Sequence, residues 1–96
     1  MIVIHLIKNT GIFAENKDIA KDIRIKKLIP ALEKNKEVVI DFEGIEGATQ
    51  SFIHALISDL IRKYGSEIFD KIKFKSCNNT IKEIISIVAD YMQESD

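Results

Sequence analysis

The chain has 96 residues, of which 46% are hydrophobic and 30% are charged, with a formal net charge of −1. This size and composition predict one globular domain over residues 1–96, and the charge gives no support for a general nucleic-acid binder. A lone cysteine, Cys77, excludes an internal disulfide, and the apolar start MIVIHLI is too short to cross a bilayer. We therefore expect a cytoplasmic protein with no membrane partner.

The first third of the chain predicts a strand and then a long helix. Residues 2–8 are β-branched and apolar, which indicates a strand. Residues 9–16 are expected to form a loop, with an extra short strand near 10–15 as an alternative. A helical pattern starts after Asn16, which is a suitable N-cap, and runs to about residue 35. Pro30 lies inside this pattern, so we expect a kink or break near Ile29.

The rest of the chain predicts two further strand and helix pairs. Residues 37–42 form an apolar strand, and residues 50–64 carry a helical apolar stripe that Gly65 ends. The segment KIKFK at 71–75 alternates strictly, which is typical of a strand with one dry face and one wet face. The final helix is expected over 79–93, with Asn78 or Asn79 as its N-cap.

The predicted order is therefore β-α-β-α-β-α, which indicates an α/β domain. Such alternation favours a parallel or mixed sheet with right-handed crossovers. The lysines of KIKFK lie on one side of their strand. We therefore expect the helices to pack mainly on one face of a small sheet, or this strand to lie at an edge.

The side chains that could carry catalysis are scattered in the sequence. His5 and His54 have no metal ligands at a suitable spacing, and Cys77 has no legible base beside it. The basic run at 17–27 is interrupted by aspartates and lacks aromatic residues, so we interpret it as a solvated helix face and not as a nucleic-acid site. We expect no enzyme activity, no metal and no cofactor.

The segment VVIDFEGIEGATQSFIHAL, residues 38–56, is the most informative part of the sequence. Gly44 and Gly47 suit a tight link between strand and helix, but the segment lacks the Lys-Ser/Thr of a phosphate-binding loop. Thr49 or Ser51 could cap the helix, or one of these hydroxyls could be a phosphorylation switch. Asp41 and Glu43 face the same side of an extended chain without an acid–base partner.

This segment, with Asp41-Phe42 followed by a Gly-containing loop and Ser51-Phe52, resembles the signature of the small bacterial STAS-like family. The resemblance implies a mixed sheet with helices packed on it. Many STAS domains are anti-sigma-factor antagonists, which bind a histidine-kinase-like ATPase that phosphorylates a serine at the start of this helix. Gln50 stands at that serine's position here, and Ile53-His54-Ala55 replaces the acidic residues that STAS-like members tend to carry.

These observations predict a regulatory protein-interaction module that resembles an anti-sigma-factor antagonist and binds an intracellular protein, with a histidine-kinase-like ATPase as the first candidate. The expected partner-binding or regulatory residues are Asp41, Glu43, Gly44, Gly47, Thr49, Gln50, Ser51 and His54. The alternative is a domain that binds a small ligand or nucleotide with the 43–51 loop and the following helix N-terminus. A further alternative is a structural subunit that forms a homodimer through a sheet edge.

Overall fold

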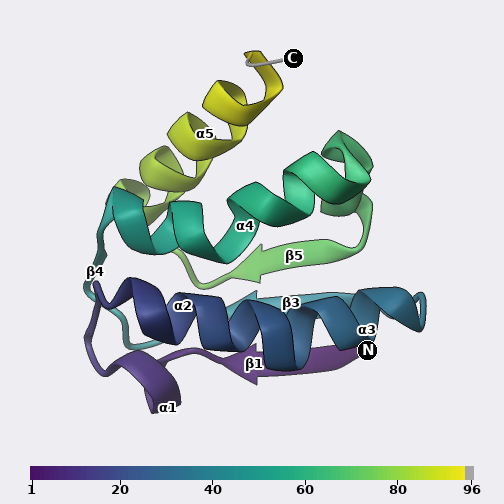
Figure 1. Cartoon of the computed structure of the whole chain (residues 1–96). Coiled ribbons are helices and arrows are strands. Elements are labelled where there is room, and N and C mark those ends of the chain that lie inside the picture. Colours follow the sequence, from purple (N-terminus) through teal and green to yellow (C-terminus); the bar gives the residue numbers. More distant parts are fainter. Residues whose placement is uncertain (95–96) are drawn as a thin grey trace.

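A three-stranded parallel sheet forms the centre of the computed structural model, which describes residues 1–94 (Figure 1). The strands are β1 (Ile2–His5), β3 (Val38–Asp41) and β5 (Ile72–Lys75), in the order β1-β3-β5. Ile2 lies opposite Val38, and Val38 lies opposite Ile72, with parallel pairing in both cases. This arrangement confirms the α/β class that the alternating pattern predicts.

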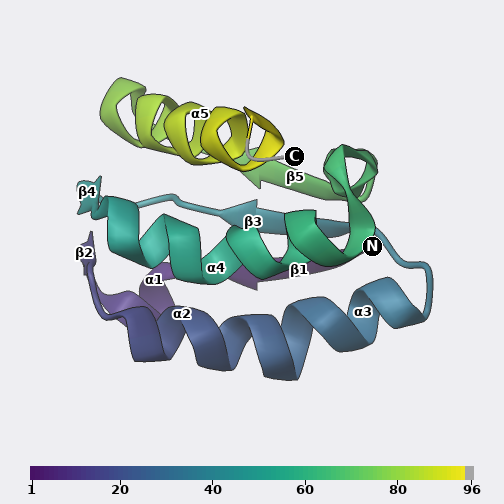
Figure 2. The same cartoon turned by 45° about the horizontal axis from the view of Figure 1, so that its top comes forward.

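The helices cover one face of this sheet. The helices α2 (Lys17–Ile23), α3 (Ile29–Glu33) and α4 (Gln50–Tyr64) lie in front of the strands, whereas α5 (Asn79–Glu94) runs beside the edge of β5 and packs against α4 (Figures 1 and 2). Ile4, Ile40 and Ile72 point to the helices and are at most 3% exposed. Val3 and Lys73 point to the other face and are exposed. The wet face of KIKFK is thereby confirmed.

The core lies between this sheet and the helices. The two largest fully buried side chains are Phe42, at the end of β3, and Phe52, in the first turn of α4. α4 supplies seven buried residues, because its apolar positions repeat with the helical period on a broad stripe. The long helix that the sequence predicts at 50–64 is therefore present with those bounds and is the main element of the core.

The helix after Asn16 continues through Pro30. The Asn16 side chain accepts hydrogen bonds from the N–H groups of Asp18 and Ile19, which confirms its role as the N-cap. The π-helical segment η1 (Arg24–Leu28) separates α2 from α3. A proline has no N–H group to bond the carbonyl four residues earlier, and the wider π turn stands at that place. The predicted disturbance is thus a change of hydrogen-bond pattern, and the helical path is not broken.

Several short elements differ from the sequence prediction. The first strand ends at His5 and not at residue 8, because the carbonyl of Leu6 accepts from the N–H groups of Asn9 and Thr10 and starts the one-turn helix α1 (Ile7–Thr10). The extra short strand expected near 10–15 is present as β2 (Phe13–Ala14).

Two further short elements were not predicted. β2 pairs in parallel with β4 (Gly47–Ala48), and a 3-10 helix, η2 (Ser66–Asp70), precedes β5. Both stretches have too few residues to show a periodic apolar pattern. Of the two possible caps of the last helix, Asn78 is the one used, since its Oδ1 accepts from the N–H of Ile81 at 2.9 Å.

Candidate functional site

The start of α4 is fixed by Thr49. Its backbone is extended (φ −88°, ψ 156°), and its hydroxyl accepts a hydrogen bond from the N–H of Phe52 at 3.1 Å. The Thr49 N–H in turn donates to the carbonyl of Ala14 at 3.0 Å. Thr49 is therefore the helix cap, and its hydroxyl is already engaged, which decides between the two capping residues that the sequence left open.

The link before this cap is tightly packed. Gly44 has a φ of 83°, and a Cβ atom there would lie 2.6 Å from Cδ1 of Ile7. A Cβ atom on Gly47 would lie 3.1 Å from the ring of Phe13, on the neighbouring strand β2. Only glycine satisfies both the left-handed backbone and the close contact at position 44. The two glycines thus hold the 43–51 loop against residues 7–13.

A shallow surface hollow of about 460 Å³ adjoins the first turns of α4. Its lining consists of Lys17, Gln50, Ser51, His54 and Ala55. Gln50 and Ser51 are exposed, and His54 is half-buried. The hydroxyl of Ser51 has no hydrogen-bond partner within residues 1–94. We call this group of five residues the α4-start surface; it combines one cation, one imidazole and a free hydroxyl.

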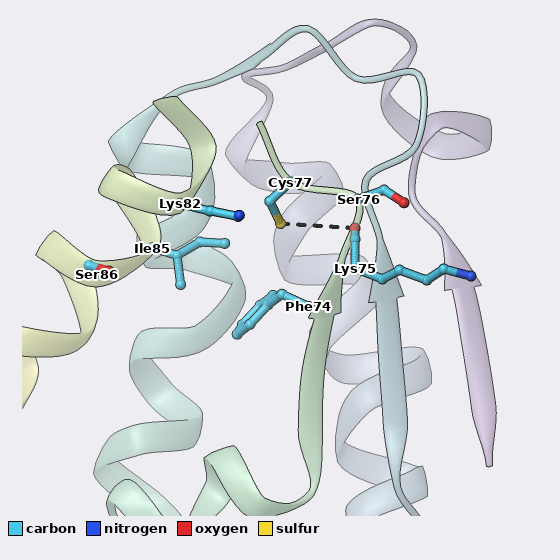
Figure 3. A pocket seen from close by; sticks show the side chains of 7 residues that line it. All are labelled: Phe74, Lys75, Ser76, Cys77, Lys82, Ile85 and Ser86. Atoms are coloured by element: carbon cyan, nitrogen blue, oxygen red, sulfur yellow. Dashed lines mark hydrogen bonds between the residues drawn. The ribbon is translucent and has the colours of Figure 1, made fainter. Parts of the chain in front are cut away.

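The predicted residue Asp41 lies elsewhere, in a row of side chains across the carboxyl ends of the strands. The register aligns His5 with Asp41 and Asp41 with Lys75. The carboxylate Oδ2 is 3.4 Å from Nδ1 of His5, and Oδ1 accepts from the N–H of Glu43 at 2.9 Å. Lys75 extends from the end of β5 across the sheet (Figure 3). Asp41 is only 3% exposed, and its carboxylate is held between these groups at this end of the sheet.

The charge of Asp41 is favoured by its surroundings. The Glu43 N–H is the largest cause that lowers the pKa of the carboxyl, Lys75 and His5 lower it further by charge, and a hydrogen bond from Ser76 adds to this, although burial opposes the shift. Ser76 and His5 both contact the carboxylate. In a nucleophile–base pair the hydroxyl would instead bond to the imidazole, so this row lacks the geometry that activates a serine.

A second hollow, of about 640 Å³, lies between the end of β5 and α5 (Figure 3). Phe74, Cys77, Lys82 and Ile85 are among its lining residues. The Cys77 Sγ is 3.9 Å from the carbonyl oxygen of Lys75, and burial raises the pKa of the thiol, although the charge of Lys82 opposes this. A thiol with a raised pKa is a poor nucleophile, so this hollow has no activated group.

The predicted site residues therefore fall into two groups. Gln50, Ser51 and His54 line the α4-start surface. Thr49 caps the helix that carries them, and Gly47 pairs with β2 just before this cap. Asp41 and Glu43 belong to the carboxyl ends of the strands, as does the turn at Gly44.

Lys17 and His5 are the residues that sequence reasoning missed. Lys17 reaches the α4-start surface because β2 and β4 pair and bring the first residues of α2 and α4 together. His5 meets Asp41 through the register of β1 and β3. Lys17 could have been found only from the pairing of β2 with β4, and strands of two residues leave no periodic pattern in the sequence.

Among residues 1–94, no three His, Cys, Asp or Glu side chains come together in a way that could hold a metal ion. Over the same residues, no helix is long and apolar enough to cross a membrane.

Comparison with protein-family models finds a match to about two thirds of the chain. The model of a protein family described as a STAS-like domain of unknown function matches residues 20–82, which is 63 of the 96 residues. This range contains the long helix from Ala20, the strand β3, the whole of α4 and the strand β5. No curated protein and no solved structure matches the chain. The resemblance that the 38–56 segment carries is thereby confirmed.

Proposed function

The chain belongs to the family of STAS-like domains of unknown function, and we propose that it is a non-enzymatic regulatory module that binds another protein through the α4-start surface. The partner that the resemblance favours is a histidine-kinase-like ATPase, and the regulated process is then of the anti-sigma-factor antagonist type. Such a module works by complementary surface contacts, so it needs neither a cofactor nor a nucleophile–base pair.

The observation that carries this proposal is that only one of the two hydroxyls at the start of α4 is used to cap the helix. Thr49 is bonded to the N–H of Phe52, whereas Ser51 is exposed and unbonded within the described residues. Ser51 lies in the first helical turn, where the positive end of the helix dipole tolerates a phosphate group. Gln50, which stands where the anti-sigma-factor antagonists carry their phosphorylated serine, is its direct neighbour. We therefore assign the regulatory hydroxyl to Ser51.

A phosphate group on Ser51 would change the charge of the α4-start surface while leaving the fold intact. The group would bring nearly two negative charges to a place that now carries Lys17 and His54 beside a polar amide. Lys17 can pair with the phosphate, but a partner that approaches with an acidic or apolar surface would lose contact. The modification would therefore release the partner and leave the core of α4 unchanged.

The alternative of a nucleotide site at the 43–51 loop is less well supported. Glu43 and Glu46 lie in this loop, and both would repel a phosphate group. The Phe52 N–H, one of the free donors that a phosphate would need, is occupied by Thr49. The 43–51 loop therefore disfavours a small anionic ligand, and we keep a protein as the proposed partner.

The proposal is tested with histidine-kinase-like ATPases encoded near the gene of this chain. Calorimetry measures the affinity of each ATPase for wild type, Ser51→Ala and Ser51→Glu. We expect Ser51→Ala to bind as wild type does and Ser51→Glu to lose roughly 1–3 kcal/mol of binding free energy, the scale for an unpaired charge in an interface. Lys73→Glu, on the open face of the sheet, is the matched control.

The outcomes separate the surface from general charge effects. An equal loss in Ser51→Glu and Lys73→Glu would contradict the assignment of the α4-start surface. Binding to none of the ATPases, with the protein folded, would contradict the proposed class of partner. Thermal unfolding of each variant shows whether the fold is kept, as we expect for an acidic residue in a first helical turn.

A further inference from the structure

The outer edge of β1 is an unpaired strand edge. In the sheet, β1 pairs only with β3 among the described strands. The N–H groups of Ile2 and Leu6 bond to the carbonyls of Glu37 and Asp41. Because backbone groups alternate in direction along a parallel strand, those of Val3 and His5 point away from β3. Two outward N–H groups and their carbonyls are thus available to a further strand.

This edge borders a groove of about 350 Å³. β1 contributes one wall through Ile2, Val3 and Ile4. The other wall comes from η1, α3 and the turn after them, which form the second half of the helical rod α2-η1-α3. Pro30 and Ala31 give the helical wall an apolar base. The α3 end of the rod lies beside β1 in Figures 1 and 2. The groove is therefore bordered by the edge strand on one side and by helix on the other, the place where an added strand would lie.

The rest of the lining is basic. Four lysines lie along the groove: Lys26, Lys27, Lys34 and Lys36. Lys26 is 3.9 Å from Asp22, at the limit of an ion pair, and the other three have no carboxylate partner in the part of the chain that the structure describes. The whole chain has a net charge of −1, so the positive charge of the groove is a local feature and not a property of the entire surface.

From these observations we propose that the β1 edge binds an extended acidic segment of a partner protein as an added strand. The outward backbone groups of Val3 and His5 supply the main-chain hydrogen bonds, which is the mode known as β-augmentation. Side chains of an added strand alternate between two faces. Those on the helix side would meet Pro30, Ala31 and the lysines, so acidic residues at every second position fit the groove.

This site is separate from the α4-start surface. The groove lies along the β1 edge, the second half of the helical rod and the turn that follows it, whereas the α4-start surface contains residue 17 and the first turns of α4. The two surfaces have no lining residue in common. A failure of the proposed ATPase interaction would therefore leave this inference untouched, and the reverse also holds.

The test uses a synthetic probe with the full chain. A fluorescent peptide of about eight residues with alternating glutamate and threonine has the length of a typical strand and high strand propensity. The matched probe replaces each glutamate by lysine. Fluorescence anisotropy should show saturable binding of the glutamate peptide only, with an affinity that falls as salt is raised.

Two variants separate the charge from the main-chain contribution. Lys27→Glu with Lys34→Glu should weaken binding by roughly tenfold or more, whereas Lys21→Glu with Lys63→Glu, outside the groove, should change it less than about twofold. Val3→Pro removes one outward N–H group without removing a bond to β3, so it should also weaken binding.

Hydrogen exchange reports directly on the added strand. The amides of Val3 and His5 should exchange fast in the free protein and become protected in the complex, while that of Ile4 stays protected in both. This readout keeps the test valid if Val3→Pro does not fold. Protection of Val3 and His5 without the peptide, rising with protein concentration, would show that a second copy of the chain occupies the edge and would overturn the proposal.

Equal binding of the acidic and basic peptides would also overturn it, as would a glutamate peptide that binds without protecting these amides. Absence of saturable binding by the glutamate peptide at low salt would do the same.

Discussion

Asp41 shows how a single side chain connects three strands that are distant in the sequence. It contacts His5, which lies 36 positions earlier. The positive charge of Lys75, which lies 34 positions later, lowers the pKa of its carboxyl group. The sequence shows Asp41 as an isolated carboxylate beside Glu43. Only the parallel register places a basic residue on each side of it. Such a row depends on strand pairing, so local spacing could not reveal it.

The first prediction concerns the acid stability that Asp41 provides. The pKa of this carboxyl is lowered in the folded protein from its ordinary value of 3.8. Its stabilising effect is therefore fully present above the unfolded pKa, near pH 4, and is lost as the pH falls through the lower folded pKa. Asp41→Asn should flatten the loss of unfolding free energy below about pH 4.

Chemical denaturation at a series of pH values between about 5 and 2 measures this dependence. If wild type and Asp41→Asn lose unfolding free energy at the same rate over this range, Asp41 does not carry the effect.

Residue-scale predictions from sequence succeeded where the interaction is local. Asn16 bonds to N–H groups two and three residues away, so a cap at that position follows from residue type and place. The choice between Thr49 and Ser51 was not decided by residue type, because both hydroxyls precede the same apolar stripe. The pairing of β2 with β4 decides it, since it holds Thr49 against Ala14.

At the scale of elements, the packing of the long helical rod on α4 rests partly on Arg24. Its Nη1 donates to the carbonyl of Ala55 at 2.6 Å, and its Nη2 lies 3.2 Å from Oδ2 of Asp59. Arg24 is only 11% exposed, whereas Asp59 is half exposed. The sequence offered Arg24 as part of a solvated basic run. Arg24 directly follows α2, which packs against α4.

The second prediction follows from this contact. Arg24→Met keeps the length of the side chain but removes both interactions, and it should lower the free energy of unfolding by about 1–3 kcal/mol. Asp59→Asn should cost less than about 1 kcal/mol, because the ion pair is largely in solvent. Urea denaturation measures both variants. Equal losses would indicate that the ion pair, and not the bond to Ala55, joins the two helices.

At the scale of the whole molecule, the sheet is covered on one face only. The alternation of KIKFK predicted either this or an edge position for the strand, because lysine at every second position disfavours a second helical layer there. Both alternatives hold, since β5 is also an edge strand in the order β1-β3-β5. The order of the six main elements also followed from sequence. The sequence did not predict the α1 turn, the pairing of β2 with β4, or the two grooves at the sheet edges. They depend on contacts between segments that have no pattern of their own.

The third prediction concerns how stability is distributed. β3 is central in the sheet, and its Val38 and Ile40 are fully buried, so its amides should exchange only through global unfolding. β2 and β4 have two residues each, with Phe13 exposed, and should exchange through local opening at lower free energy. Amide exchange at increasing denaturant measures both. Equal opening free energies would show that the short pair unfolds together with the core.

The parallel order of the strands also has a consequence for how the chain reaches its native state. Ile2 pairs with Val38, and Val38 with Ile72, so each strand pair closes a loop of 36 or 34 residues, and neither pair of the main sheet is a hairpin. Such non-local pairing slows the search for the native state, while helices form from near neighbours. During synthesis, β1, the helical rod and β3 emerge before α4 and β5. Until β5 emerges, the edge of β3 that pairs with it in the native sheet has no partner, and unpaired strand edges of this kind promote association between folding chains.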